Sequence, residues 1–197
     1  ANENNDVRVL VLKANGRHFS AGADLNWMQR MAEYSEAENQ SDAKVLAKLM
    51  YTLHQSPKPT IVAVQGAAFG GGVGLIAACD IAVGAQQSKF CFSEVKLGII
   101  PAMIGPYILR NLGYTNTKKL FLTGEIFDSF EAAKLNLIDK FVSTKDIINE
   151  RDILIDKLLL GGPKAQTAIK NYLKNIYSKS ISGDVIKYAA ENIAELR

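Results

Sequence analysis

The sequence predicts an α/β fold with a parallel, layered core. Short apolar runs alternate with longer stretches in which apolar residues recur at helical spacing. This repeated strand-then-helix order is typical of a parallel sheet covered by helices. With 197 residues, of which 48% are hydrophobic, the chain is long enough to bury a substantial core.

The first half of the chain contains four apolar runs that predict buried strands. A helix with one polar and one apolar face is expected over residues 37–54, and a short apolar helix over 71–79. Loops rich in glycine, alanine and asparagine separate these segments and mark their ends. The strands are expected at 7–12, 60–65, 81–84 and 89–92.

The second half becomes helical after Pro101. Asp128 is followed by Glu131 with the spacing of a capping box, and Pro163 after two glycines marks the end of one helix and the start of the next. Apolar residues recur on one face of each late helix, which fits an internal core, a subunit interface or both. The helices are expected at 102–111, 115–122, 130–135, 145–160, 163–177 and 183–196.

Two loops of small residues follow predicted strands. Residues 69–74 (Phe-Gly-Gly-Gly-Val-Gly) lead into a helix, and adjacent glycines there leave backbone N–H groups uncovered at the positive helix end. Such groups can stabilise a developing oxyanion, although glycines at this junction also serve close packing or a tight turn. The earlier loop, residues 15–25, can bring a second N–H close to a ligand. Together the loops predict a two-donor oxyanion hole.

In their order along the chain, these loops and several further segments resemble the crotonase family of enoyl-CoA hydratases and isomerases. The resemblance implies a ββα spiral core over residues 1–112 and a helical C-terminal region over 113–197 that forms a trimerisation layer. A homotrimer or homohexamer is therefore expected, and both ends of the chain are expected to lack segments that the family carries. The further matching segments are 59–66, 78–82, 92–94, 98–101, 122–124 and 132–138.

By this resemblance, the N–H groups of Ala23 and Gly71 hold the thioester oxygen of an acyl-CoA, which is the substrate, and no other cofactor is required. Polarising that carbonyl makes the β-carbon of an enoyl group electrophilic and the α-proton acidic. Asp24 is also expected to cap a helix that begins near residue 25. The remaining residues expected to contact substrate are Ala21, Asp24, Leu25, Asn26, Gly70, Gly74, Pro101 and Met103.

The resemblance makes Glu94 the carboxylate that handles water or a proton beside the acyl chain. Its apolar neighbours predict a raised pKa, which suits proton exchange near neutral pH. Without the surrounding motif, a surface or salt-bridged glutamate would be favoured. Gly74 departs from the family pattern, because many hydratases carry a second glutamate there. We expect Gly74 to leave empty space for a branched or carboxylated acyl group, with Met103 and Tyr107 reshaping the pocket.

Three functions fit these residues. The first is a hydratase that uses Glu94 alone, and its local sequence looks like that of the bacterial 3-methylglutaconyl-CoA and isohexenylglutaconyl-CoA hydratases of leucine and terpene breakdown. The second is a Δ3,Δ2-enoyl-CoA isomerase, which needs one carboxylate to move a proton. The third is a non-catalytic family member that binds acyl-CoA or RNA, for which a basic helical face is the candidate surface. That face would contain Lys164, Lys170, Lys174 and Lys179.

The composition argues for a cytoplasmic enzyme. A net charge of +3 is too small to favour nucleic acid as a partner, and no apolar run is long enough to span a membrane. Cys79 and Cys91 lie in apolar runs and are expected to be buried, reduced thiols. His18 and His54 have no second ligand at metal spacing, so no metal site is expected.

Overall fold

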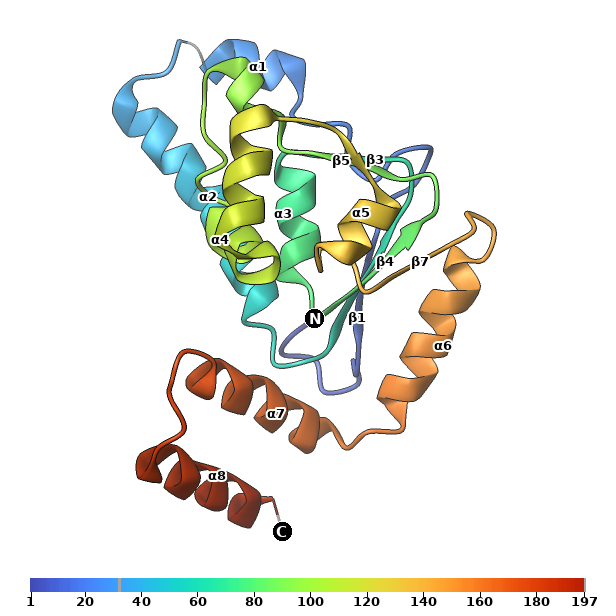
Figure 1. Cartoon of the computed structure of the whole chain (residues 1–197), viewed down its shortest axis with the longest axis vertical. Coiled ribbons are helices and arrows are strands. Elements are labelled where there is room, and N and C mark those ends of the chain that lie inside the picture. The colour runs from blue at the N-terminus through green and yellow to red at the C-terminus, as the bar shows by residue number, and fades with distance from the viewer. Residues whose placement is uncertain (32, 197) are drawn as a thin grey trace.

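The chain is described by a computed structural model that covers residues 1–31 and 33–196, and the side chain of Leu25 lies outside the described part. The larger sheet consists of β1 (Leu10–Lys13), β2 (Thr60–Val64), β4 (Ile81–Ala85) and β7 (Lys140–Val142), in that spatial order (Figure 1). All its neighbouring strands are parallel. Because β2 lies inside the sheet and is buried at every position, its sequence is almost continuously apolar instead of alternating.

A second, three-stranded sheet positions the functional loops. It consists of β3 (Ala67–Phe69), β5 (Lys89–Cys91) and β6 (Phe127–Asp128), with β5 in the middle. Strands β3 and β5 are parallel, whereas β6 is antiparallel to β5. Ser20 adds a parallel bridge to Ala68 on the other side of β3. Three chain segments therefore run in the same direction along this sheet.

Helices surround both sheets, and α3 lies at the centre of the molecule (Figure 1). Most of α3 is buried, since it packs against both α2 and α4. The helices are α1 (Leu25–Met31), α2 (Glu36–His54), α3 (Gly71–Ala78), the 3-10 helix η1 (Ser93–Leu97), α4 (Gly105–Thr123), α5 (Ser129–Lys134), α6 (Ile147–Leu159), α7 (Pro163–Ile176) and α8 (Gly183–Glu195).

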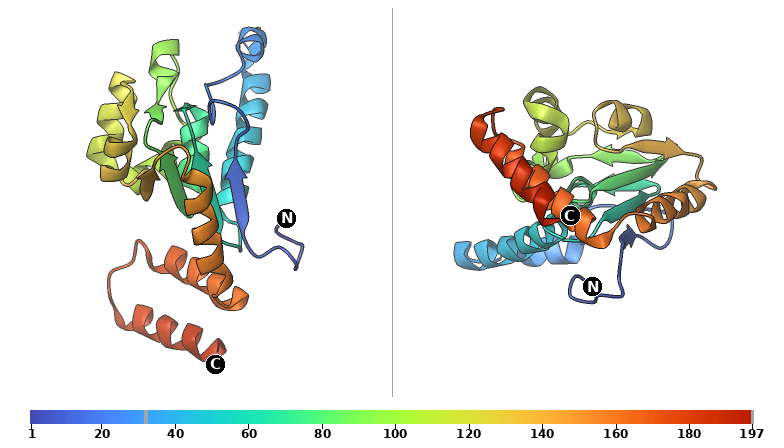
Figure 2. Two further views of the ribbon diagram at one scale, coloured as in Figure 1. Left: turned by 90° about the vertical axis from the view of Figure 1, so that its right-hand side faces the viewer. Right: turned by 90° about the horizontal axis from the view of Figure 1, so that it is seen from below.

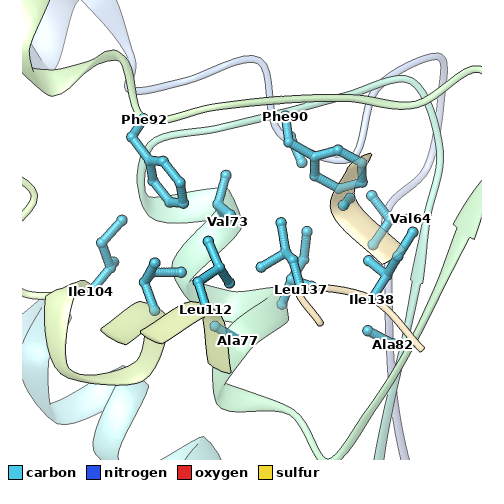
Figure 3. Packing of buried hydrophobic residues seen from close by; sticks show 14 of the residues in the cluster. Val64, Val73, Ala77, Ala82, Phe90, Phe92, Ile104, Leu112, Leu137 and Ile138 are labelled. Carbon is cyan, nitrogen blue, oxygen red and sulfur yellow. The ribbon is translucent and has the colours of Figure 1, made fainter. Parts of the chain in front are cut away.

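One hydrophobic core joins the two sheets to α3 and α4. Side chains from β2, β5, α3 and α4 belong to the same buried cluster (Figure 3). Aromatic rings link β5 and the residue after it to β6 and α4: the ring of Phe90 stacks on Phe127 at 5.6 Å, and the ring of Phe92, directly after β5, meets that of Phe121 edge-on at 4.9 Å. This packing fixes the end of β5, from which the chain enters η1.

The α/β architecture and most of the predicted elements are confirmed, and the differences have local causes. Strands β3, β6 and β7 were not expected, because two or three residues are too few to show an alternating pattern. The two helices expected at 102–111 and 115–122 are the two halves of α4, interrupted by the positive φ of Gly113. The predicted boundary at 112 thus falls inside α4. Region 113–197 is also not purely helical, since it contributes β6 and β7.

The predicted starts of α5 and α7 are confirmed, but only one half of the capping box expected at Asp128 and Glu131 is present among the described hydrogen bonds. The Asp128 carboxylate accepts a hydrogen bond of 3.0 Å from the Glu131 N–H at the start of α5. Pro163 opens α7, with Gly162 as its N-cap. A full capping box that the sequence analysis did not identify begins α2, where the Ser35 hydroxyl and the Glu38 carboxylate satisfy each other's backbone N–H groups.

Helices α7 and α8 form a pair at one end of the molecule (Figure 2). Their contact includes the stacked rings of Tyr172 and Tyr188, whose centroids are 5.8 Å apart. Lys170 joins α7 to the start of the larger sheet through an ion pair with Asp80. The Asp80 carboxylate also accepts hydrogen bonds from the N–H and hydroxyl of Thr60, at 2.8 and 2.9 Å. The pair is therefore fixed to the N-terminal ends of β2 and β4.

Candidate active site

The ends of three parallel segments bring the predicted site residues to one edge of the smaller sheet. Ser20 pairs with β3, and β3 pairs with β5, all in parallel. Ala23 lies three residues after Ser20, Gly71 two residues after β3, and Glu94 three residues after β5. Since parallel strands present their C-terminal ends at one edge, the order of the sheet alone places these three residues together.

The turn from β3 into α3 depends on Gly70. This residue has a φ of +54°, which glycine adopts without steric cost, and its N–H donates to the Cys91 carbonyl at 2.9 Å. A Cβ on Gly70 would lie 3.2 Å from Oε1 of Glu94, whereas a Cβ on Gly71 would meet no atom within 4 Å. Gly70 therefore leaves room for the Glu94 carboxyl group, and Gly71 borders open space.

The loop before α1 is held at both ends. His18 Nδ1 accepts a 3.0 Å hydrogen bond from the Ala67 N–H, and the Asp24 carboxylate accepts one of 2.8 Å from the Trp27 N–H. Asp24 thus caps α1, as the sequence predicted. Among the described residues, the N–H groups of Ala23 and Gly71 donate to no protein acceptor, so both remain available to a ligand.

Glu94 lies on η1 in a largely apolar environment. Its Oε2 atom is buried and has no hydrogen-bond partner within the described chain. Burial raises the pKa of the Glu94 carboxyl group, although its own backbone N–H opposes this shift. The direction matches the sequence prediction. A carboxyl group with a raised pKa and a free oxygen can accept and return a proton.

A cavity of about 440 Å³ adjoins these groups. Of the predicted site residues, its wall contains Ala23, Gly70, Gly71, Glu94, Pro101 and Met103. Trp27, Met28 and Met31 from α1 also line it, as do Ser93 and Leu97 from η1. The arrangement combines two free backbone donors, the carboxyl groups of Glu94 and Asp42, and a mainly apolar space large enough for an acyl chain.

Four of the other predicted substrate-binding residues do not line this cavity. Ala21, Asp24 and Asn26 are exposed and lie outside its wall. Gly74 is buried behind the wall. For Leu25, the side chain falls outside the described part of the chain. Contacts of Ala21, Asp24, Leu25 and Asn26 with the remainder of a CoA molecule stay predictions.

The expectation that Gly74 leaves empty space is wrong. A Cβ on Gly74 would lie 2.1 Å from Cγ2 of Ile104 and 3.2 Å from Cε of Met50. Ile104 therefore fills the place of the missing side chain. Tyr107, which was expected to reshape the pocket, instead packs edge-on against His54 with the ring centroids 5.3 Å apart.

One face of α2 forms a cavity wall that the sequence analysis did not identify. Asp42, Val45, Leu46 and Leu49 line the cavity, with the i, i+3, i+4, i+7 spacing of residues on one face of a helix. The sequence predicted a helix with one polar and one apolar face here. It could not show that this face borders a cavity, because that depends on the position of η1 and the loop that follows it.

The proposed basic face of the C-terminal helices is partly used inside the protein. The Lys170 side chain is 11% exposed and bound to Asp80, and Lys174 donates to the Gln55 side chain at 2.9 Å. Burial and the neighbouring Lys170 charge lower the pKa of Lys174. Only Lys164 and Lys179 of the four lysines are exposed without an ion pair to a described residue.

The two cysteines are free, but only Cys91 is fully buried as expected, whereas Cys79 is partly buried. Cys91 is buried, and its thiol donates to the Gly124 carbonyl at 3.2 Å. Burial raises the pKa of Cys79 to about 12, so this thiol stays protonated at neutral pH. Over residues 1–31 and 33–196, no helix combines the length and apolar character that a membrane crossing requires.

Comparison with known proteins shows the family to which the chain belongs. The family model described as enoyl-CoA hydratase/isomerase matches residues 1–194. A crystal structure described as an enoyl-CoA hydratase/isomerase (crotonase) from Legionella pneumophila is 47% identical with a TM-score of 0.95, and the match covers 98% of this chain and 75% of that one. An enoyl-CoA hydratase from Shewanella pealeana is 42% identical with a TM-score of 0.96, over 100% of this chain and 73% of that one.

A curated relative bears both activity names. The enoyl-CoA isomerase/hydratase of Mycosarcoma maydis is 36% identical over 165 residues, which are 83% of this chain and 59% of the relative. The chain spans 59% to 66% of the length of the first curated relatives that it matches. From its sequence, its fold and the arrangement of its loops, the chain belongs to the enoyl-CoA hydratase/isomerase family, the crotonases.

Proposed function

We propose that this protein is an enoyl-CoA hydratase that works with a single carboxylate, Glu94. The observation that carries the proposal is the position of Glu94, which lines the same cavity as Ala23 and Gly71 and whose buried Oε2 has no hydrogen-bond partner in the described chain. The free N–H groups of Ala23 and Gly71 would hold the thioester oxygen. Acyl-CoA serves as substrate, and the reaction requires no further cofactor.

In the proposed reaction, hydrogen bonds from Ala23 and Gly71 draw electron density onto the thioester oxygen, which leaves the β-carbon electron-poor. The Glu94 carboxylate accepts a proton from a water molecule as the water oxygen bonds to the β-carbon. The α-carbon then takes up a proton from Glu94, which restores the thioester and the carboxylate. The raised pKa of Glu94 supports both transfers near neutral pH.

The cavity supports a mainly aliphatic acyl group. Its described wall contains Met28, Met31, Leu46, Leu97 and Met103 but no lysine, arginine or histidine. A branched aliphatic chain fits such a lining. The sequence resemblance favours 3-methylglutaconyl-CoA, whose distal carboxylate would need a positive group from outside this wall, such as one on a second subunit.

A second candidate is the Δ3,Δ2-enoyl-CoA isomerase, and the packing around Gly74 favours it. Ile104 occupies the place where a second carboxylate would stand, so the described wall offers no such group there to hold water opposite Glu94. Isomerisation needs Glu94 only to remove a proton from the α-carbon and return it to the γ-carbon. The names of the relatives include both activities.

The reaction type can be tested on a panel of CoA thioesters with product masses recorded. The panel contains crotonyl-CoA, 3-methylcrotonyl-CoA, 3-methylglutaconyl-CoA and 3-hexenoyl-CoA. A mass gain of one water on a 2-enoyl substrate supports the hydratase, and conversion of 3-hexenoyl-CoA to its conjugated isomer without a change in mass supports the isomerase. No reaction with any thioester, despite measurable acyl-CoA binding, would refute both enzymatic candidates.

We also propose a homotrimer or homohexamer. Several late helices carry exposed apolar side chains, including Leu160, Ile169 and Ile181, and burying them in an interface would be favourable. The engagement of Lys170 and Lys174 within the protein weighs against a nucleic-acid-binding face on α7.

A further inference from the structure

Ile104 lies between α3 and the cavity, and we propose that it selects the acyl group by the size of the substituent at its β-carbon. This inference rests on the proposed binding of acyl-CoA at Ala23 and Gly71. It assigns a specificity role to a residue outside both the oxyanion loops and η1.

The contact that supports this role is the close fit of Ile104 against Gly74. A Cβ built on Gly74 would lie 2.1 Å from Cγ2 and 2.7 Å from Cβ of Ile104. Ile104 is 1% exposed to solvent, yet it also forms part of the cavity wall. Its side chain therefore has the core behind it and the acyl cavity in front of it.

The spacing along α3 indicates how far from the thioester carbonyl Ile104 borders the acyl chain. Gly71 and Gly74 are three residues apart, so they lie on the same face of α3, about one turn or 5 Å from each other. If the Gly71 N–H holds the thioester oxygen, Ile104 borders the part of the acyl chain just beyond the carbonyl. The β-carbon, two bonds beyond the carbonyl carbon, lies at this depth, whereas the end of a longer chain lies farther away.

Ile104 is also a rigid boundary. Its side chain is branched at Cβ, which restricts its rotamers, and it belongs to the buried cluster that includes Val73 and Phe92 (Figure 3). By contrast, Met28, Met31 and Met103 form other parts of the wall, and unbranched methionines adapt to ligands of different shape. The cavity should therefore discriminate strictly at the β-carbon and loosely along the rest of the chain.

The test compares the binding of two saturated thioesters, butyryl-CoA and 3,3-dimethylbutyryl-CoA, by titration calorimetry. These ligands differ only in two methyl groups at the β-carbon, and neither has a double bond to hydrate or shift. We expect Ile104→Ala to improve the affinity for the dimethyl ligand relative to butyryl-CoA by about tenfold, the lower end of what pocket methyl groups contribute to discrimination. Ile104→Val should change the ratio in the same direction by less.

Ile108 provides the matched control. It is fully buried in the first turn of α4, four residues after Ile104 at the N-cap, and does not line the cavity. Ile108→Ala and Ile108→Val therefore remove the same atoms from the core. These variants should leave the affinity ratio within about twofold of the wild-type value. If either alanine variant does not fold, the valine pair provides the comparison.

An unchanged ratio in both Ile104 variants would overturn the inference, as would an equal change in the Ile108 variants. The experiments also distinguish a failure of this inference from a failure of the proposed function. If the saturated thioesters bind and their ratio responds to Ile104, but no unsaturated thioester is converted, the selector role stands and the enzymatic proposal is wrong.

Discussion

Glu94 occupies a position at which a negative charge is costly to the folded protein. Its Oε2 is buried without a hydrogen-bond partner in the described chain, and burial raises its pKa. An unpartnered carboxyl group destabilises a protein, and one that faces a cavity is available to a substrate. The same desolvation that suits Glu94 to proton transfer should therefore reduce stability at neutral pH.

This cost predicts the pH dependence of stability. The folded-state pKa of Glu94 lies above its unfolded value of about 4.3. The protonated Glu94 carboxyl group therefore stabilises the folded protein fully below a pH equal to that unfolded value. This stabilisation is lost as the pH rises through the folded-state pKa. We expect Glu94→Gln to raise the melting temperature at pH 7 and to have little effect near pH 4, measured by thermal unfolding across this range.

Glu36→Gln provides the control for this comparison. Glu36 is exposed in the first turn of α2 and does not line the cavity, so its replacement should not produce a pH-dependent gain. A Glu94→Gln variant that melts at a lower temperature than the wild type at pH 7 would show that the native carboxylate is stabilised by its surroundings.

The start of α3 illustrates how one short element meets several requirements with glycine. Gly70 supplies a positive φ, while a Cβ on Gly72 would lie 2.5 Å from that of Ser20 in the neighbouring loop. The absence of a side chain at Gly74 leaves room for the Ile104 side chain. Only Gly71 borders open space, which leaves its N–H accessible from the cavity. The close-packing and tight-turn alternative is therefore confirmed for Gly70, Gly72 and Gly74, and the oxyanion-hole role of Gly71 stays a prediction.

Gly74→Ala tests the packing of α3 against α4. The added Cβ would overlap Ile104, and overpacking of this kind costs about 1–3 kcal/mol or more of unfolding free energy. Urea unfolding should therefore show a clear loss of stability. Gly71→Ala, whose Cβ meets no atom within 4 Å, should be nearly neutral in the same measurement.

A double variant separates this contact from the intrinsic effect of alanine at position 74. Ile104→Ala removes the clashing methyl group, so Gly74→Ala should cost less in that background than in the wild type. Equal costs in the two backgrounds would show that Ile104 does not limit the space at Gly74.

At the scale of the whole molecule, the larger sheet separates the candidate site from the C-terminal helix pair. The site forms beyond the C-terminal ends of β3 and β5, whereas α7 is fixed at the N-terminal ends of β2 and β4 through Asp80 and Lys170 (Figures 1 and 2). Lys170 also donates to the Lys58 carbonyl at 3.0 Å. The attachment of α7 is therefore a structural feature that can be altered independently of Glu94.

Lys170→Met should loosen α7 without removing the site. Loss of the charged hydrogen bonds to Asp80 and Lys58 should cost about 1–3 kcal/mol of unfolding free energy and speed proteolytic cleavage around residues 160–163. Lys164→Met, at an exposed position on the same helix, should change neither quantity. Equal protease resistance of the two variants would contradict the proposed anchoring role of Lys170.

The sequence predicted the parts of the fold that depend on local patterns. The buried strands β2 and β4 and the long helices have apolar patterns over five or more residues, and Asp128 and Pro163 mark helix starts by their own chemistry. Strands as short as β6 form because β5 and the aromatic cluster hold them, so their own sequence carries little signal.

The site shows the same limit. Glu94 and the two loops could be predicted because each follows a strand and lies in an ordered series of motifs. The lack of empty space beside Gly74 could not be predicted, because the residue that fills it, Ile104, lies thirty residues later in the chain. Likewise, only the assembled fold shows that Lys170 of α7 meets Asp80.

The most direct test of single-carboxylate catalysis is the turnover of enoyl-CoA thioesters by wild-type protein and by Glu94→Gln, with acyl-CoA affinity measured on both. We expect the wild type to convert at least one thioester and the variant to lose about 10²–10⁴-fold in rate, while binding butyryl-CoA with nearly unchanged affinity. A Glu94→Gln variant that retained the full rate would contradict the assignment of Glu94 as the proton-transferring residue.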